Sequence, residues 1–339
     1  MTRTETTRRH WRVLRNALLH STSNETCVSS TDVYDTTASS VATDFFSLYQ
    51  KTEVDTVQLL RMHSPLQANF TWMVYDVPVE ANKTKKIYVH EKRNDIKPRV
   101  SMAELLSHQV NHGVDNTGNI RTWPSEQVLL SYLLSSNVCL QVQRRDATGN
   151  YLPITCCELG SGMAGLASLG LLACPPVKLQ RIVVTDGNPL SVKNLQLCIE
   201  ENKIHHVNSI YDESVVISTE LLRWDRNVRC RKDLEHQFDL VFASDCLFFE
   251  DFHQDLAYTI KSLLRPKSGR CLLLQPRRNG SMERFSMIAK CYGFSIQESR
   301  DYDPHIVCQH VEYQQTRCDY VCDVHYPVLL TLTLDNDDE

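Results

Sequence analysis

The chain has 339 residues and a formal net charge of -5, with a pI near 6.2. This length is enough to bury one large core and a smaller second one, while the acidic balance argues against a nucleic-acid-binding protein that works through bulk positive charge. Thirteen cysteines without a regular spacing favour reduced thiols, and hence the cytoplasm and nucleus, over a disulfide framework. No apolar run approaches the length of a membrane span, so no membrane partner is expected.

Residues 1–40 are predicted to form a basic helix followed by a linker. Five arginines fall among Ser and Thr within the first fifteen residues, a composition that mitochondrial transit peptides also have. We favour an amphipathic helix over His10–His20, because Trp11, Leu14 and Leu18 fall on one stripe. The stretch Ser21–Ser40 is rich in Ser and Thr, which indicates a loop or linker.

Residues 41–120 are predicted to form a smaller β-containing region. The runs that suggest it are short and alternating or apolar: Phe45–Gln50, Val54–Arg61, Phe70–Val79 and Lys86–His90. After a turn-rich stretch at 113–118, a helix is expected over Ser125–Ser135, since Pro124 suits the first turn of a helix and Glu126 its first residues.

Residues 121–339 are predicted to form a doubly wound, mostly parallel α/β domain. The strand candidates are Ile154–Leu159, Ile182–Thr185, Val215–Thr219, Leu240–Ser244, Cys271–Leu274, Phe294–Glu298 and Val328–Leu334. The helix candidates between them are Ala164–Ala173, Leu190–Asn202, Phe252–Leu264 and Met282–Tyr292, and an irregular stretch is expected before the last strand. Strands that alternate with helices imply βαβ units and a parallel sheet.

A glycine turn after the first of these strands is typical of a nucleoside pocket. Gly160 and Gly162 let the backbone turn sharply and approach a ligand, and Asp186 ends the next strand, where an acid can bind both ribose hydroxyls. With Gly165 the spacing also satisfies the dinucleotide fingerprint, so an NAD-dependent oxidoreductase is the natural alternative. Glu158 favours S-adenosylmethionine, because a carboxylate suits a sulfonium and an α-amino group better than a pyrophosphate.

Polar or aromatic residues follow several predicted strands, and ligands of such sheets bind beyond the carboxyl ends of the strands. These residues are Glu158, Asp186, Trp224-Asp225, Asp245 and Arg277-Arg278. Asp245 favours a site, because a carboxylate at the tip of a central strand is costly to bury unless it is paired. Trp224 is a candidate to cover an adenine ring, and an ordinary half-buried tryptophan is the alternative.

Other residues near this rim have two readings. Phe248 and Phe249 would line an alkyl channel or cap the core, and Arg277 and Arg278 would bind an anionic partner or form a solvated basic pair. The cysteines and histidines near the C-terminus lack a C-x-x-C pair and regular spacing, so no metal is expected.

Motifs spread along the chain resemble those of the calmodulin-lysine N-methyltransferase family, a branch of the seven-strand methyltransferases that modify protein lysines. They are His10-Trp-Arg-Val-Leu-Arg, Asp115-Asn-Thr-Gly-Asn-Ile, Trp123-Pro-Ser-Glu, Glu158-Leu-Gly-Ser-Gly-Met, Thr185-Asp-Gly-Asn, Leu222-Arg-Trp-Asp, Ala243-Ser-Asp-Cys-Leu-Phe, Pro276-Arg-Arg, Tyr302-Asp-Pro-His-Ile and His325-Tyr-Pro-Val-Leu-Leu. The match is firm from about Val110 onward and looser before it. Because the basic N-terminal helix also looks familial, the transit-peptide reading is weakened.

The resemblance implies a class I, Rossmann-like enzyme that uses S-adenosylmethionine to trimethylate one lysine of calmodulin, and that acts as a monomer. The positions that match cofactor contacts, with Glu158 and Asn188 added from the same motifs, are Trp123, Glu158, Gly160, Ser161, Gly162, Asp186, Asn188, Trp224 and Ser244. Asp245 and Phe248 match the D-x-x-Y/F element beside the target lysine. Ser161 and Ser244 replace residues that are usually Gly or Ala, and Phe248 replaces the Tyr of many relatives.

In the mechanism that this implies, Asp245 orients the lysine ammonium and helps it to lose its proton, since the reference pKa of lysine is near 10.4. Phe248 and Phe249 are expected to be walls of the lysine channel, and Arg277 and Arg278 to complement acidic calmodulin. A catalytically silent methyltransferase fold that only binds calmodulin is the second alternative, because an intact cofactor site does not prove turnover.

Overall fold

The computed structural model describes residues 45–59, 62, 70–80, 83–92, 122–206 and 215–334. The expected basic helix over His10–His20, the linker Ser21–Ser40 and the motif that starts at Asp115 lie outside these residues. The division of the chain into residues 1–40, 41–120 and 121–339 stays a prediction.

Seven strands form the central sheet. They are β4 (Ile154–Glu158), β5 (Leu179–Asp186), β6 (Val216–Leu221), β7 (Leu240–Ser244), β8 (Arg270–Gln275), β9 (Phe294–Ser299) and β10 (Val328–Leu334). Their order is β6-β5-β4-β7-β8-β10-β9, and β10 runs antiparallel to both of its neighbours while the other adjacent strands are parallel. This confirms the doubly wound, mostly parallel sheet, and the antiparallel strand β10 inserted beside the edge strand β9 is the order of a class I methyltransferase.

The direction of strand addition reverses between β4 and β7. From β4 the chain adds β5 and β6 on one side, whereas β7 starts the other side. Both strands are continuous apolar runs: every residue of β4 is buried, and so are Leu240 to Ala243 of β7. Buried parallel strands have such continuous apolar sequences because helices cover both faces of the sheet. A crevice is expected beyond the carboxyl ends at this switch point.

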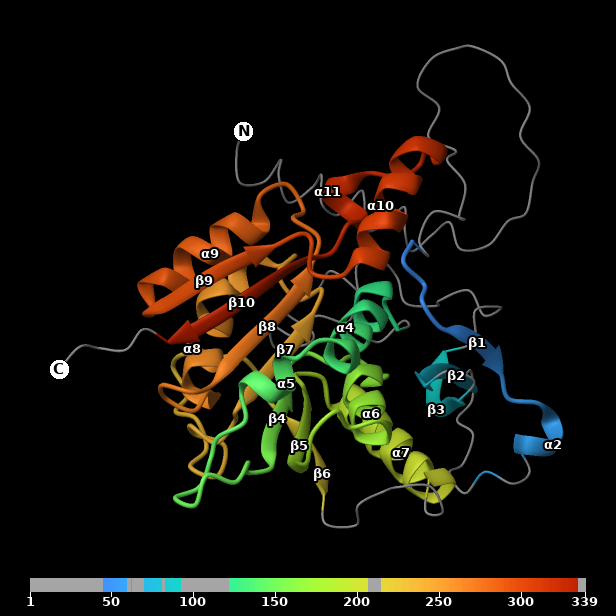
Figure 1. The fold of residues 1–339 in the computed structure, drawn as a ribbon, viewed down its shortest axis with the longest axis horizontal. Helices are drawn as coiled ribbons and strands as arrows, with labels where there is room; N and C mark the ends of the chain where they lie inside the picture. The colour runs from blue at the N-terminus through green and yellow to red at the C-terminus, as the bar shows by residue number, and fades with distance from the viewer. Residues whose placement is uncertain are drawn as a thin grey trace.

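Helices cover the two faces of the sheet (Figure 1). On one side lie α4 (Pro124–Ser135), α6 (Leu166–Ala173) and α7 (Pro189–His206), and on the other lie α8 (His253–Leu263) and α9 (Ser281–Cys291). Short helical segments are α2 (Thr56–Leu59), α5 (Val138–Gln141) and η2 (Glu250–Phe252). The helix α6 is buried along its whole length, since α4 packs against it from outside.

A separate antiparallel sheet consists of β1 (Gln50–Glu53), β2 (Phe70–Glu80) and β3 (Lys83–Lys92). It lies beside α6 and α7 (Figure 1), which β3 contacts. His90 on β3 donates from Nδ1 to Oδ1 of Asn194 on α7 at 2.7 Å, and Nδ2 of Asn194 donates to the carbonyl oxygens of His90 and Met163 at 2.7 and 2.9 Å. Asn194 therefore ties the small sheet to the chain that follows the glycine turn.

The stretch before β10, which the sequence suggested to be irregular, is helical. It contains α10 (Pro304–Thr316) and α11 (Cys322–His325). Oδ1 of Asp303 accepts hydrogen bonds from the backbone N–H groups of His305 and Ile306 at 2.8 and 3.4 Å, so an N-cap followed by a proline starts α10. Because β9 ends and β10 begins at the carboxyl end of the parallel strands, these helices stand at the same rim as the switch point.

The opposite, amino-terminal rim holds a buried acid between two cations. Asp239, which precedes β7, is 1% exposed. Its Oδ1 accepts from Nε of Arg144 and of Arg265, each at 2.8 Å, and its Oδ2 accepts from the backbone N–H of Thr155 at 2.9 Å. Buried charges persist when they are paired in this way.

In the described part of the chain, no helix is both long and apolar enough to cross a membrane.

Candidate active site

The glycine turn after β4 has the backbone conformation that its residues favour. Gly160 and Gly162 have φ values of +60° and +62°, in the left-handed region that glycine enters without a steric penalty. The backbone N–H of Gly162 donates to Oδ2 of Asp186 at 2.9 Å. The acid at the end of β5 thus holds the turn at the end of β4, across the neighbouring parallel strands.

Asp186 is the centre of this half of the site. It is 9% exposed, and its second oxygen, Oδ1, accepts from the backbone N–H of Asn188 at 2.8 Å. These two bonds fix the orientation of the carboxylate at the end of β5. The location of Asp186 matches the prediction from the sequence.

Two other expected cofactor residues bond to the backbone instead. Oγ of Ser161 donates to the carbonyl oxygen of Thr185 at 3.1 Å, and Oδ1 of Asn188 accepts from the N–H of Leu190 at 2.9 Å, which caps α7. These bonds brace the turn and start the helix. Contact of Ser161 and Asn188 with a cofactor stays a prediction, as does that of Ser244, the half-buried last residue of β7.

Trp224 lies against the glycine turn. A Cβ added to Gly160 would come within 3.2 Å of Cζ2 of the indole, so the ring covers this glycine closely. Trp123 is the N-cap residue of α4, and Glu126 of the same helix bonds to the start of α6. Both indoles are half-buried, and contact of Trp123 with a cofactor stays a prediction.

Two buried carboxylates meet at the N-terminus of α6. Oε1 of Glu126 accepts from the N–H groups of Leu166 and Ala167, and Oε2 of Glu158 accepts from that of Ser168 at 3.1 Å. Burial raises the pKa of Glu158 to about 7. Burial, followed by the charge of Glu158, raises the pKa of Glu126 well above its ordinary value. The helix N-terminus favours negative charge here, but desolvation opposes it more strongly.

The small sheet reaches the same region through Glu91, which is 3% exposed. Its Oε1 accepts from Oη of Tyr75 at 2.8 Å and from Oγ1 of Thr122 at 2.5 Å, and its Oε2 pairs with Lys51. Because Thr122 immediately precedes Trp123, this network ties the chain before α4 to the N-terminal sheet.

The second half of the site contains Asp245, which follows β7. Its carboxylate forms an ion pair with Arg278: Nε donates to Oδ1 at 3.0 Å, and Nη2 donates to Oδ1 and Oδ2 at 2.8 and 2.6 Å. The side chains are 11% and 16% exposed. A buried carboxylate at a strand tip requires a partner, and for Asp245 this partner is Arg278. The sequence suggested Arg278 instead as a residue that binds an acidic protein partner.

The chain after Asp245 is held by groups of three elements. Oε1 of Gln275, the last residue of β8, accepts from the N–H of Leu247 at 3.0 Å. The carbonyl oxygen of Leu247 accepts from Nε2 of His253 at 2.9 Å and from Oγ of Ser281. The ring of Phe248 lies 4.3 Å from that of Phe249, centroid to centroid, and 5.8 Å from the guanidinium carbon of Arg278. Both phenylalanines are half-buried, as walls of a channel would be.

Arg277 does not contact Asp245 in this structure. Its Nη1 lies 2.6 Å from Oε1 of Glu283, and its Nη2 pairs with Glu298. Both arginines expected to dock an acidic partner are thus paired within the chain, and their docking role stays a prediction that the geometry does not favour.

Several residues of the site were missed by reasoning from the sequence. Gln275 ends a strand, so the rule of carboxyl ends would have found it. Glu126 was read only as a helix-start residue, although its place after Trp-Pro was visible. Asp323 holds the Arg278 loop by accepting from two backbone N–H groups, and nothing in the sequence pattern pointed to it.

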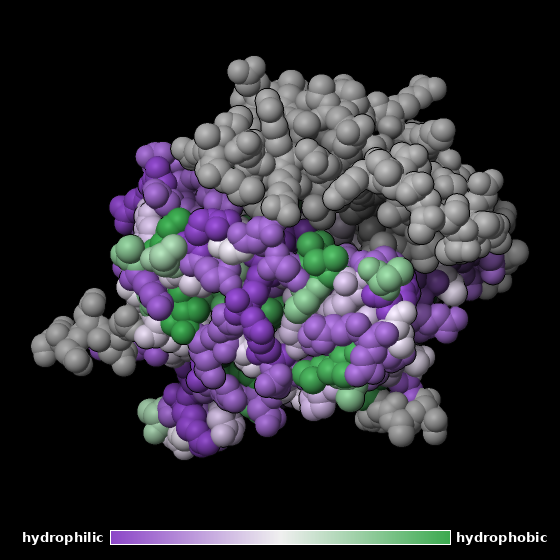
Figure 2. Space-filling model, turned by 90° about the horizontal axis from the view of Figure 1, so that it is seen from above, coloured by the Kyte–Doolittle hydropathy of each residue, from purple (hydrophilic) through white to green (hydrophobic). Residues whose placement is uncertain are grey.

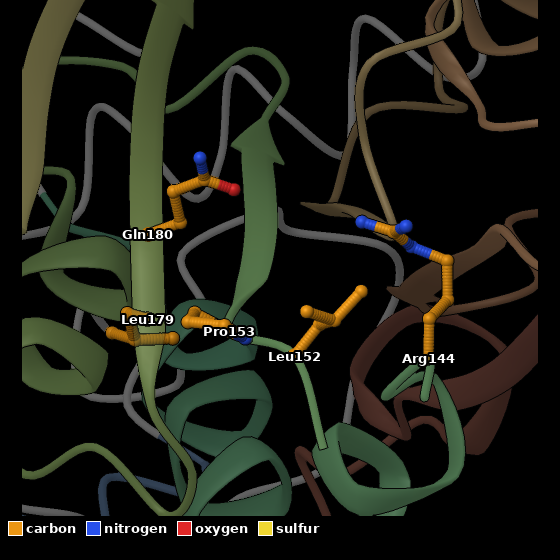
Figure 3. A pocket seen from close by; sticks show the side chains of 5 residues that line it. All are labelled: Arg144, Leu152, Pro153, Leu179 and Gln180. Atoms are coloured by element: carbon orange, nitrogen blue, oxygen red, sulfur yellow. The ribbon is translucent and has the colours of Figure 1, made fainter. Parts of the chain in front are cut away.

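A cavity of about 360 Å³ opens elsewhere, at the amino-terminal rim (Figure 3). Its lining residues are Arg144, Leu152, Pro153, Leu179 and Gln180. Leu179 and Gln180 begin β5, so this cavity lies at the opposite end of the strands from the glycine turn. Within the described residues, no group of three or more His, Cys, Asp or Glu side chains is arranged to hold a metal ion.

A comparison with family profiles identifies the family of the chain. The sequence profile of the lysine methyltransferase family matches residues 106–291. A calmodulin-lysine N-methyltransferase of Arabidopsis thaliana is 28% identical over 331 residues, which cover 95% of each chain. Among solved structures, a 16S rRNA N2 G1207 methyltransferase of T. thermophilus, in complex with AdoMet and guanosine, has a TM-score of 0.42 at 14% identity and covers 80% of this chain and 52% of its own. A precorrin-6y C5,15-methyltransferase of Geobacter metallireducens has a TM-score of 0.35 at 12% identity, over 64% of this chain and 90% of its own.

Proposed function

The chain belongs to the lysine methyltransferase family, and from this premise we propose that it transfers methyl groups from S-adenosylmethionine to a lysine of calmodulin, up to the trimethyl state. The observation that carries the proposal is the meeting of two groups of residues at the switch point of the sheet. The glycine turn with Asp186 follows β4 and β5, and Asp245 with Phe248 follows the adjacent strand β7.

The residues around the turn fit S-adenosylmethionine. Asp186 would accept from the ribose hydroxyls, and Trp224 would cover the adenine, since its ring already lies against Gly160. When bound, this cofactor supplies an electrophilic methyl group on a sulfonium. Burial raises the pKa values of Glu158 and Glu126 near the turn, and a cationic ligand beside them would favour their ionised forms, whereas the pyrophosphate of NAD would not.

The residues after β7 would hold the lysine. Asp245 offers a carboxylate near the surface of the site, and Phe248 and Phe249 form an apolar pair beside it. Such walls exclude water from the reacting amine and align it, and alignment of two reactants can lower a barrier by several kcal/mol. The channel has to admit a dimethylated amine for the third transfer.

Calmodulin is proposed as the substrate because the Arabidopsis relative matches along nearly the whole chain, including its N-terminal part. Figure 2 shows the molecule from above the view of Figure 1. On this face the described surface is mostly hydrophilic, with hydrophobic residues in separate patches. Since Arg277 and Arg278 are paired internally, we place the docking of the acidic partner on other parts of the rim. Action as a monomer in the cytoplasm and nucleus is part of the same proposal.

Labelled S-adenosylmethionine and calmodulin test the proposal directly. The wild-type enzyme should label one lysine, which peptide mapping identifies, and mass spectrometry should show three added methyl groups on it. Asp186→Ala, assayed in parallel, should lose the labelling. A wild-type protein that binds both S-adenosylmethionine and calmodulin without transferring label would support the catalytically silent alternative instead.

A further inference from the structure

The ion pair of Asp245 and Arg278 is built more firmly than a surface salt bridge. Three hydrogen bonds of 2.6 to 3.0 Å join the two side chains, and both are nearly buried. A bidentate guanidinium–carboxylate pair of this kind has a fixed geometry as well as a favourable energy. The carboxylate that the proposed function assigns to the lysine is therefore not a free negative charge.

Both partners are held in backbone conformations that side chains rarely adopt. Asp245 has φ +49°, Arg278 has φ +48°, and Asn279 continues the left-handed conformation with φ +55°. The α11 residue Asp323 anchors this loop: its carbonyl oxygen accepts from the N–H of Arg278 at 2.9 Å, and its Oδ2 accepts from that of Asn279 at 2.6 Å. Strain of this kind persists only when the surroundings over-determine it, and it clusters at functional sites.

The pairing changes what the channel offers to a lysine. An unpaired carboxylate would stabilise the ammonium form, because an opposite charge within about 4–6 Å raises the pKa of an amine. The ammonium has no lone pair with which to accept a methyl group. A carboxylate neutralised by a guanidinium gives the ammonium no such advantage, yet it can still accept one N–H from the neutral amine.

We propose that Arg278 is a positioning residue that neutralises Asp245, so that the channel takes up the target lysine as a neutral amine whose proton has already passed to solvent. The inference rests on the function proposed above. It assigns to Arg278 an effect on the protonation state of the substrate instead of a contact with an acidic partner.

Three titratable groups beside the ion pair have shifted pKa values. Burial and then the charge of Arg278 lower the pKa of His325 on α11 to about 4, burial lowers the pKa of His253, and burial with the charge of Asp245 raises the pKa of the Cys246 thiol. The remaining charged neighbours are Asp323 on α11, Arg277 with Glu283 and Glu298, and Arg284 with Glu250. Burial also raises the pKa values of Glu158 and Glu126 in the cofactor half of the site, so the shift of the profile between wild type and an Arg278 variant, and not the wild-type profile alone, would report on the lysine.

Single-turnover methylation of calmodulin by cofactor-saturated enzyme, measured from pH 7 to 9.5, tests the proposal. In Arg278→Met the midpoint of the pH–rate profile should rise by about one pH unit or more. The rate at pH 7.5 should then fall about tenfold, the difference from wild type should shrink toward pH 9.5, and KM for calmodulin should not rise. Arg278→Lys, which keeps the charge, should hold the midpoint near that of wild type.

Two further variants control for damage to the loop. Arg284 on α9 forms a similar bidentate pair with Glu250 of η2 and also donates to the carbonyl oxygen of Asn279 in the Arg278 loop at 3.0 Å. Arg284→Met therefore disturbs the same loop without removing the charge of Arg278, and it should leave the midpoint unchanged. Asp245→Asn leaves Arg278 as an unpaired cation, so its midpoint should move to lower pH although its maximal rate falls. If Arg278→Met and Asp245→Asn lose the same fraction of the rate at every pH, Arg278 only supports the loop and the inference is wrong.

A failure of the proposed function would look different. Wild-type enzyme would then bind S-adenosylmethionine without labelling calmodulin at any pH. The charge of Arg278 can still be read without a substrate, because NMR titration should show a higher pKa for His325 in Arg278→Met than in wild type. An unchanged pKa of His325 would overturn the inference whatever the substrate is.

Discussion

Glu158→Gln should stabilise the cofactor-free protein above neutral pH. Glu158 is 1% exposed. Glu126 of α4 bonds to the start of α6 beside it, and the pKa of Glu126 is also raised. Burial raises the pKa of Glu158 from 4.5 to about 7. The folded state therefore binds more protons than the unfolded state between these pH values, and its free energy of unfolding falls as the pH rises through this window.

The size of the effect follows from the two pKa values. The difference between 4.5 and about 7, at 1.36 kcal/mol for each pKa unit, corresponds to about 3 kcal/mol. This contribution is fully present below pH 4.5 and is lost above pH 7. A glutamine keeps an oxygen for the N–H of Ser168 and does not ionise. Its removal of one negative charge also relieves Glu126, so about 3 kcal/mol is a reasonable scale for the gain at pH 8.

Urea denaturation of both proteins at pH 5, 6, 7 and 8 checks this reasoning. The free energy of unfolding of Glu158→Gln relative to wild type should grow with pH and level off above 7. The same variant should bind S-adenosylmethionine more weakly, because it lacks a carboxylate near the cationic ligand. A stability difference that does not change with pH would show that Glu158 ionises normally in the folded state, and would refute the argument.

Three further predictions concern single residues. Asp186→Ala should weaken S-adenosylmethionine binding by about 1.5–3 kcal/mol, the range for hydrogen bonds to a charged group, and calorimetry that finds unchanged affinity would remove Asp186 from the site. Gly160→Ala should also weaken S-adenosylmethionine binding, since the new Cβ would lie 3.2 Å from Trp224 at a residue with φ +60°. Gly149→Ala is the matched control: its φ of +87° makes the substitution strained, but open space surrounds it, so the affinity for S-adenosylmethionine should not change. Asp239→Ala should lower the free energy of unfolding by about 3–5 kcal/mol, because it leaves two guanidinium groups unpaired, and an unchanged urea midpoint would contradict this.

Most of the central sheet could be predicted from the sequence, because its strands are buried on both faces. The bounds of β7 and β10 were predicted to the residue, since β7 is an apolar run between two aspartates, and β10 is an apolar run after a proline that continues as alternating Leu and Thr. The helix α10 was missed because a buried stripe is lacking: Ile306 is its one buried residue in the structure. The sequence did contain a start signal for this helix, the N-cap residue Asp303 followed by Pro304. Such a local signal is not visible in the hydropathy pattern, which indicates only the residues of the core.

The site could be predicted in part for a similar reason. The glycine turn and Asp186 belong to one βαβ unit, so their spacing along the chain determines their meeting in space. The pairing of Asp245 with Arg278 instead depends on a left-handed loop and on Asp323, which lies 44 residues beyond Asn279 in sequence. Neither hydropathy nor spacing encodes such a contact, and for this reason Arg278 looked like a free surface cation.

The two rims of the sheet differ in how they treat buried charge. At the amino-terminal rim, Asp239 is matched by two guanidinium groups and two bonds from Thr155, so its charge is stabilised in the free protein. At the carboxyl-terminal rim, Glu126 and Glu158 lie side by side with raised pKa values, so a cationic ligand would relieve what the free protein leaves unfavourable. Because a ligand that binds only the folded state stabilises it more the tighter it binds, the enzyme should gain more stability from S-adenosylmethionine, which carries a sulfonium, than from its uncharged-sulfur product at the same free ligand concentration. This asymmetry would favour release of the product after each transfer, which a reaction of three successive transfers requires.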